Sequence, residues 1–404
     1  MLRPQPLGVL PLPAGALLLP DVPGAAAVAA DLVRGIVPST WPEGLAFVAD
    51  VLAGRETEVP GDDDVARINR FVLAPSPEHH AALRPTLAPE LGTLLDALAF
   101  TAGVSDTATS NTATTDTNTA PGLQGELLAF VLLAVASDHL EHGSPADARD
   151  SLLSGVAAAR EASPALAAQL LGTLAGFEGE DAVARTTEAL ALLPTGHQTQ
   201  VRAELLFGRG VALQSSAEGR PGLLKEAVRC YQQALVVFRR ESHPQEFAEA
   251  QTNLALCHLA TPMAETGDHL RLGIAVQALR DALSVWDRES HPAQWASVTL
   301  NLANALQHRP SAYQADNLVE AVELYEELLA LRGATHDPAG RARVLANQGT
   351  ALAHLGIGEH AREKLLAAQE LFTLVGEPGS ALALETTLAE LDAVRLVRSQ
   401  GAIA

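Results

Sequence analysis

A phrase that recurs along the second half of the chain constrains the fold more than any other feature of the sequence. The letters RESH followed by Pro occur at residues 240–244 and again at residues 288–292. Each copy is followed by a phrase containing Asn, Leu and Ala, and the shared Asn253 and Asn301 are 48 residues apart. A third copy is centred on Asn347, 46 residues further on. Self-similarity at such a period is typical of stacked arrays, so we expect repeated units of one supersecondary structure.

Each copy contains two segments with the hydrophobic spacing of a helix. The first helix of each pair is predicted at 245–260, 293–307 and 340–355, and the second at 271–289, 317–332 and 359–374. Small residues recur within these segments, as Ala255, Ala303 and Gly349 in the first helices and as alanines seven residues apart in the second. A large side chain at such positions would strain a close-packed interior, so we expect the helices of a pair to approach closely there.

These phrases resemble tetratricopeptide repeats. The spacing from Gly349 to Ala361 is 12 residues and from Ala361 to Ala368 is 7, as in the 34-residue repeat of that family. The corresponding first intervals in the two preceding copies are longer, at 20 and 18 residues, and we assign the excess to longer turns between the two helices. The recurring phrase His-Pro-x-x-(Phe/Trp)-Ala, at 243–248 and 291–296, resembles the longer repeats of kinesin light chains and of many bacterial repeat proteins. The resemblance implies an all-α fold, a right-handed superhelix of about five to six stacked helical hairpins.

A polar stretch divides the chain into predicted domains. Residues 105–122 consist mainly of Ser, Thr, Asp, Asn and Ala, a composition typical of flexible linkers. We therefore predict a small helical N-terminal head at 1–104, a linker at 105–122 and the repeat domain at 123–404. In the head, segments 41–52 and 91–101 have helical spacing, and Asp62, Asp63 and Asp64 are placed to cap a helix that begins near Val65.

The charge balance limits the classes of partner. The chain has 27 Lys and Arg residues against 48 Asp and Glu, a formal net charge of −21, so we expect neither nucleic acid nor an anionic membrane surface as a partner. The only cysteines, Cys230 and Cys257, cannot form a disulfide framework. Pro11 and Pro13 interrupt an N-terminal apolar stretch that otherwise imitates a secretory signal. These features favour a cytoplasmic protein.

Motifs for catalysis are missing from the sequence. It contains no GxSxG nucleophile elbow, no GxxxxGK(S/T) phosphate loop, no HExxH zinc motif and no dinucleotide fingerprint after a strand. His139 and His142 share a helix face, but no second ligand pair is nearby, and the segment is interpreted as a helix end. We therefore expect no catalytic residues, no metal and no cofactor. An enzymatic site in the head remains a weaker alternative.

The inner wall of the predicted superhelix is the candidate site, because repeat proteins bind ligands on the concave wall that their first helices line. The family resemblance implies that the asparagine of each first helix grips the backbone of a bound peptide. The predicted partner-binding residues are Asn253, Asn301, Asn304, Gln307, Arg343 and Asn347, with Glu249 and His354 as inward neighbours. An alternative is that these asparagines only bond the neighbouring helix.

Related repeats that clamp a C-terminal carboxylate use lysines at positions occupied here by Thr252, Leu256 and Leu300. We therefore expect a protein or peptide ligand in the form of an internal segment, a folded surface or a basic tail. The sequence favours a non-enzymatic scaffold or assembly factor that binds a partner protein in the groove. The alternative is a regulatory sensor that binds a peptide or small molecule and relays this through the head.

Overall fold

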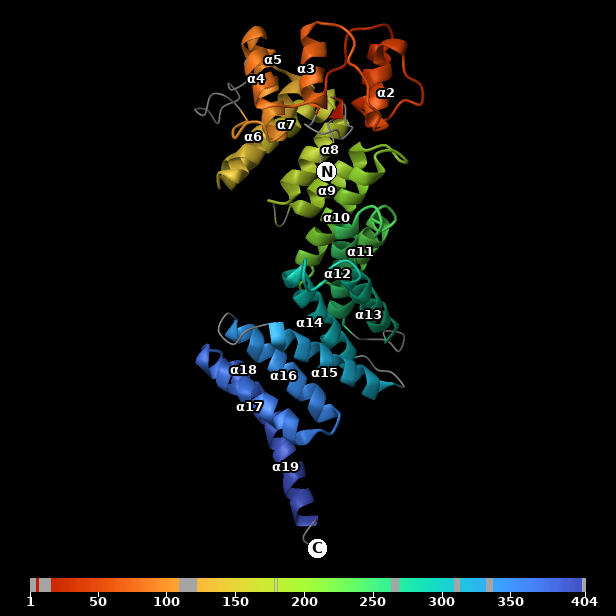
Figure 1. Ribbon diagram of the computed structural model, residues 1–404. Coiled ribbons are helices and arrows are strands. Elements are labelled where there is room, and N and C mark those ends of the chain that lie inside the picture. Colours follow the sequence, from red (N-terminus) through yellow and green to blue (C-terminus); the bar gives the residue numbers. More distant parts are fainter. Residues whose placement is uncertain are drawn as a thin grey trace. The chain divides into compact units, whose positions relative to one another are not determined.

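The computed structural model describes residues 5–6, 16–108, 122–177, 179, 181–262, 269–308, 313–331 and 337–401. Within these residues almost all regular structure is helical, and two short strands pair in parallel, Gln5 opposite Ala16 and Pro6 opposite Leu17. The chain divides into two compact units, Met1–Ser216 (unit 1) and Ala217–Ala404 (unit 2). Figure 1 shows the helices of each unit following one another in sequence order.

Unit 1 begins with short strands and helices. Asp63 caps α3 as expected from the sequence, since its side chain accepts a hydrogen bond from the Ala66 backbone N–H at 2.8 Å. The elements are β1 (Gln5–Pro6), β2 (Ala16–Leu17), α1 (Ala25–Leu32), η1 (Glu43–Leu45), α2 (Ala46–Leu52), α3 (Asp64–Leu73), α4 (Pro77–Leu83), η2 (Arg84–Thr86) and α5 (Pro89–Thr101).

A buried asparagine holds the extended segment that follows β2. The Asn69 side chain accepts from the Leu18 backbone N–H at 2.7 Å and donates to the Leu18 carbonyl oxygen at 2.8 Å. Asn69 is fully buried, so both of its bonds satisfy groups that water cannot reach. The segment is thereby fixed against α3.

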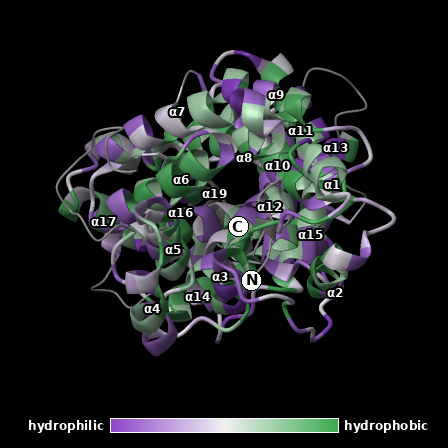
Figure 2. Ribbon diagram, turned by 90° about the horizontal axis from the view of Figure 1, so that it is seen from above, coloured by the Kyte–Doolittle hydropathy of each residue, from purple (hydrophilic) through white to green (hydrophobic). Residues whose placement is uncertain are grey.

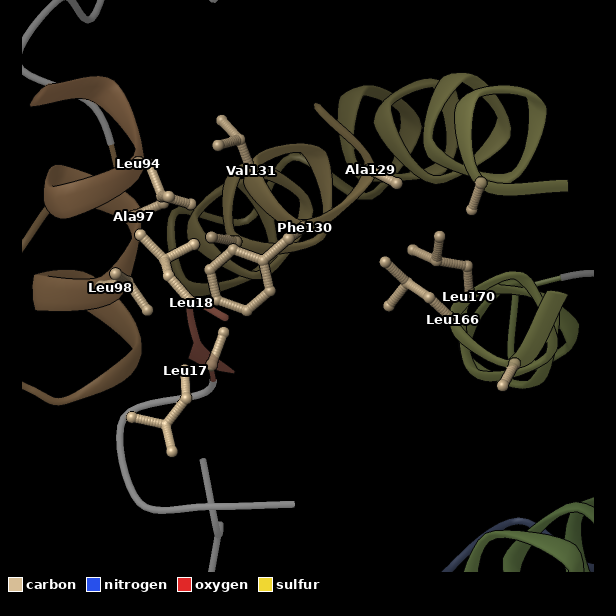
Figure 3. Packing of buried hydrophobic residues seen from close by; sticks show 14 of the residues in the cluster. Leu17, Leu18, Leu94, Ala97, Leu98, Ala129, Phe130, Val131, Leu166 and Leu170 are labelled. Atoms are coloured by element: carbon tan, nitrogen blue, oxygen red, sulfur yellow. The ribbon is translucent and has the colours of Figure 1, made fainter. Parts of the chain in front are cut away.

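Longer helices packed in antiparallel pairs complete unit 1. They are α6 (Gly125–Glu141), α7 (Pro145–Ala162), α8 (Pro164–Ala175), α9 (Ala182–Leu192) and α10 (Thr199–Ser215), and each helix packs against the next. The first elements and these hairpins share one hydrophobic core. In Figure 3, Leu18, Leu94 and Leu98 lie beside Phe130 of α6, and Leu166 of α8 approaches from the other side.

This shared core bears on the domain organisation. The predicted division into residues 1–104, 105–122 and 123–404 stays a prediction. In the structure, the boundary between the two compact units follows Ser216 in the sequence. The chain before the linker packs on α6 because its apolar residues are buried there together with those of the first hairpin. Most of the predicted linker, residues 109–121, lies outside the described residues.

Unit 2 continues the pattern of hairpins. Its helices are α11 (Pro221–Ala234), α12 (Pro244–Ala260), α13 (His269–Leu283), α14 (Pro292–His308), α15 (Gln314–Leu331), α16 (Pro338–His354), α17 (Gly358–Leu374), α18 (Pro378–Ala383) and α19 (Glu385–Gly401). Consecutive helices pack against each other from α11 to α19, and α12, α14 and α16 also touch in turn. The predicted all-α stack of helical hairpins is confirmed.

The repeated phrases set where the first helices begin. Pro244, Pro292 and Pro338 each occupy the first position of their helix, where proline has no hydrogen bond to lose and its fixed φ suits the helix. Figure 2 shows hydrophobic and hydrophilic residues mixed along the helices of both units, as expected when one side of each helix packs and another faces solvent.

The small residues that the sequence places between the helices are buried. All of the following alanines are fully buried in unit 2: Ala255, Ala275, Ala282, Ala303, Ala321, Ala361 and Ala368. Their short side chains allow neighbouring backbones to pack without voids.

Two predicted helices differ from those observed. The helix predicted at 271–289 ends at Leu283, because the Asp287 carboxylate accepts from the backbone N–H groups of Glu289 and Ser290 at 2.9 and 2.8 Å and forms a turn instead. The head segment with helical spacing at 41–52 begins as the 3₁₀ helix η1 at Glu43 and continues as α2 from Ala46 to Leu52.

Candidate functional site

Three first helices lie next to one another in unit 2, with α14 packed between α12 and α16. We call their solvent-accessible side the first-helix face. All six predicted binding residues are on these helices: Asn253 on α12, Asn301, Asn304 and Gln307 on α14, and Arg343 and Asn347 on α16.

Four polar side chains form one hydrogen-bonded cluster beside this face, in which Tyr325 and Gln307 are buried and Asn304 and Asn347 are half-buried. The Asn304 side-chain oxygen accepts from Asn347 Nδ2 at 2.8 Å and from the Tyr325 hydroxyl at 2.7 Å. The same hydroxyl lies 3.0 Å from Gln307 Oε1. A phenol has a single hydrogen to donate, so Tyr325 shares it between the two amides. Burial raises the pKa of the Tyr325 hydroxyl, which therefore stays protonated and remains a donor.

This cluster joins three helices. Tyr325 belongs to α15, so its bonds tie the second helix of a hairpin to the first helix, α14. The bond between Asn304 and Asn347 ties α14 to α16. For this pair, the structure contains the arrangement that the sequence left as an alternative, in which asparagines bond the neighbouring helix.

The other two asparagines have different surroundings. Asn253 and Asn301 are both half-buried, and the structure records no hydrogen bond to either side chain from any described residue. Asparagine in the middle of a helix costs roughly 0.7 kcal/mol relative to alanine, so its presence needs a compensating role. Each of these amides can offer one acceptor and two donor hydrogens to a ligand.

The charged residues of the face are unevenly placed. Arg343 on α16 is paired with Glu377 at 2.9 Å. Glu249 on α12 has no such partner among the described residues, and partial desolvation together with the nearby Glu246 carboxylate raises its pKa. Glu249 therefore places a carboxylate without a recorded ion-pair partner at the α12 end of the face. His354, another predicted neighbour, is exposed at the end of α16.

Sequence reasoning missed the role of Tyr325. A signal for it exists, because tyrosine follows a buried alanine of the second helix by four positions in two hairpins, at Ala227 and Tyr231 and at Ala321 and Tyr325. Both tyrosines are fully buried. Such a recurrence predicts a shared packing position.

Other groups with chemical potential show ordinary surroundings in the described part of the chain. No three His, Cys, Asp or Glu side chains there are grouped as a metal site, and His142 instead contacts Asp138 of its own helix at 2.9 Å. Cys230 and Cys257 are both buried, and burial raises the pKa of the Cys257 thiol to about 12. Over the same residues, no helix is both long and apolar enough to cross a membrane.

Comparison with known proteins returns likeness of fold only. No family model matches the sequence, and no curated protein matches it. Among solved structures, the chain is similar to BtubC (BKLC) from P. vanneervenii, with 18% identity, 66% of this chain and 92% of that chain covered, and a TM-score of 0.34.

Two further solved structures show the same kind of likeness. The TPR2AB domain of yeast Sti1, in a complex with pHSP90, shares 16% identity, with 66% of this chain and all 100% of that chain covered and a TM-score of 0.25. The APC/C hetero-tetramer Cut9-Hcn1 shares 14% identity, with 92% of this chain and 63% of that chain covered and a TM-score of 0.43. The described residues thus form repeated helical hairpins that pack through buried small residues, and the likeness to these solved structures is one of fold alone.

Proposed function

We propose that this chain is a cytoplasmic, non-enzymatic scaffold or assembly factor that binds a partner protein or peptide on the first-helix face of unit 2. The observation that carries the proposal is the pair Asn253 and Asn301, two half-buried amides with no hydrogen-bond partner in the described structure, on adjacent first helices. An amide that both donates and accepts complements the peptide group of an extended backbone.

The rigid amide cluster supports the same face. Asn304 and Asn347 use one oxygen and one nitrogen on each other, which leaves the Asn304 nitrogen and the Asn347 oxygen without a recorded partner in the described residues. Because Tyr325 holds Asn304 in place, these groups are fixed before a ligand arrives, which lowers the entropy cost of binding.

Charge favours a basic partner. The chain has a formal net charge of −21. On the face, partial burial and repulsion from the Glu246 carboxylate raise the pKa of Glu249. A lysine or arginine of a ligand beside Glu249 would stabilise the ionised carboxylate and lower its pKa. Association should therefore be slower at high salt, since salt screens such attraction.

A position-specific photo-crosslinker tests the proposal. We would place it at Ser297, an exposed residue one turn before Asn301 on α14, and at the control position Glu323, exposed on the second helix α15. The full chain is then irradiated in its own cells. A protein crosslinked from Ser297 and not from Glu323 is the expected result. Equal capture from both positions, or from Glu323 alone, would contradict the assignment of the face.

A further inference from the structure

The exposed side of α11 carries a group of positive charges. The packed side of this helix consists of buried residues three or four positions apart, which are Ala227, Cys230, Tyr231 and Ala234. Lys225 and Arg229 lie between these positions and are exposed. The turn that follows the helix adds two more exposed cations, Arg239 and Arg240. We call Lys225, Arg229, Arg239 and Arg240 the α11 basic patch.

The cations of the patch are poorly neutralised in the part of the chain that the structure describes. No ion pair or side-chain hydrogen bond is recorded there for Lys225, Arg229 or Arg239. Arg240 contacts the adjacent Glu241 at 3.7 Å, and both side chains are largely exposed. An exposed pair at that distance contributes little to stability, because water screens it. The patch therefore presents most of its charge to solvent.

This local charge runs against the composition of the chain. Residues 221–240 contain four Lys or Arg residues and one Glu, a local charge of +3, in a chain with a formal net charge of −21. Lys225 and Arg229 are four positions apart, and like charges at that spacing repel each other and weaken a helix. An anionic ligand between the two side chains would replace this repulsion by attraction.

The other side chains of this stretch favour protein carboxylates over nucleic acid as the ligand. Proteins bind single-stranded nucleic acid largely by stacking bases on aromatic side chains, but Tyr231 and Phe238 are buried. Duplex binding relies on many phosphate contacts, and four cations supply few. Val236, in the turn after α11, is 65% exposed and offers an apolar contact close to the cations in sequence.

We propose that the α11 basic patch binds an acidic segment of a partner protein. Asp or Glu side chains of the segment contact the four cations, and an apolar side chain contacts Val236. Carboxylates suit the three arginines, because a guanidinium can bind both oxygens of one carboxylate. This ligand is opposite in charge to the partner proposed for the first-helix face and binds a different helix. The chain would then hold a basic segment and an acidic segment together.

Fluorescence anisotropy with the full-length chain and a labelled peptide of repeated Glu-Glu-Leu triplets tests the patch. Lys225→Gln with Arg229→Gln should weaken binding by about tenfold, since two charge-assisted contacts are lost. The matched control is Ala330→Glu with Ala389→Glu, at exposed positions on α15 and α19, which makes the chain equally more negative and should bind as the wild type. Equal losses in both variants, or no saturable binding to the wild type, would overturn the proposal.

Two further measurements identify the ligand class and the location. A single-stranded oligonucleotide with the charge of the peptide should bind at least about tenfold more weakly, since no exposed aromatic side chain of α11 stacks its bases. Equally tight binding of the oligonucleotide would overturn the assignment to an acidic protein segment. Asn253→Ala with Asn301→Ala should leave peptide affinity unchanged. Loss of peptide binding in this variant would place the acidic ligand on the first-helix face and overturn its placement on α11.

Discussion

Gly349 and Leu365 pack so closely that a methyl group added to Gly349 would lie 2.7 Å from Leu365 Cγ. The same methyl group would lie 3.1 Å from the carbonyl oxygen of Ala361, which is backbone and cannot turn aside. Glycine is thus required by the contact between α16 and α17. The relationship explains why the repeated phrase has glycine at this position where the two preceding copies have alanine.

Replacing Gly349 by alanine should reduce the free energy of unfolding of the chain by about 1–3 kcal/mol, because α16 and α17 must separate to admit the methyl group. The control is Gly379→Ala on α18, where nothing lies within 4 Å of the new methyl group. That change should be neutral or stabilise by up to ~1 kcal/mol through helix propensity. Denaturant unfolding followed by circular dichroism compares the two, and equal stabilities would contradict the close approach.

Ala303 is the equivalent position in α14 and is fully buried. Ala303→Leu should destabilise the chain by roughly 1–3 kcal/mol through overpacking. Ala293→Leu, exposed in the first turn of the same helix, should change the stability by less than about 0.5 kcal/mol. Thermal melting of both variants checks this, and an unaltered Ala303→Leu curve would show that the helices do not meet at this residue.

Removing the Tyr325 hydroxyl should break the cluster while the ring stays in place. Tyr325→Phe leaves Asn304 and Gln307 without their shared donor, so we expect a loss of about 1–2 kcal/mol in the free energy of unfolding. Tyr313→Phe provides a matched control, since Tyr313 is 72% exposed. If both variants unfold at the same denaturant concentration as the wild type, the hydroxyl has no stabilising role.

The buried carboxylate Asp96 should be essential to unit 1. It accepts from His80 Nε2 at 3.0 Å and from Arg84 Nε at 2.9 Å, and its side chain is 7% exposed. Asp96→Asn leaves the half-buried Arg84 guanidinium without a carboxylate partner at this position and should lower the free energy of unfolding by about 2 kcal/mol. Asp62→Asn is the control, because that carboxylate is 95% exposed beside Arg70 and should matter little. A small effect of Asp96→Asn on urea unfolding would contradict a buried ion pair.

Local sequence patterns predicted most of the repeat helices and the burial of their small residues. The helix predicted at 245–260 is observed as Pro244–Ala260, because proline marks its first residue and hydrophobic spacing defines its packed side. The small residue at Ala303 indicated a close approach for the same reason, since only tight packing requires it. The turn at Asp287 was missed, because it depends on side-chain bonds to the backbone rather than on periodicity.

The candidate site could be predicted less completely from the sequence. Asn304 and Asn347 are 43 residues apart in the chain and meet only after α14 and α16 have packed. The sequence therefore could not distinguish them from Asn253 and Asn301, which have the same residue type and similar positions but no recorded partner in the described structure. The family resemblance predicted asparagine as the binding residue type, whereas tertiary packing determines which asparagines form hydrogen bonds within the protein.

The most direct measurement of the central claim is the affinity of the captured partner for two double variants, determined by isothermal titration calorimetry. Asn253→Ala with Asn301→Ala should weaken binding by about tenfold, since two hydrogen bonds to the ligand are lost, with the helical content unchanged. Gln232→Ala with Gln233→Ala, which removes two exposed amides from α11, is the control and should bind as the wild type. Equal affinity of both double variants and the wild type would contradict binding at the first-helix face.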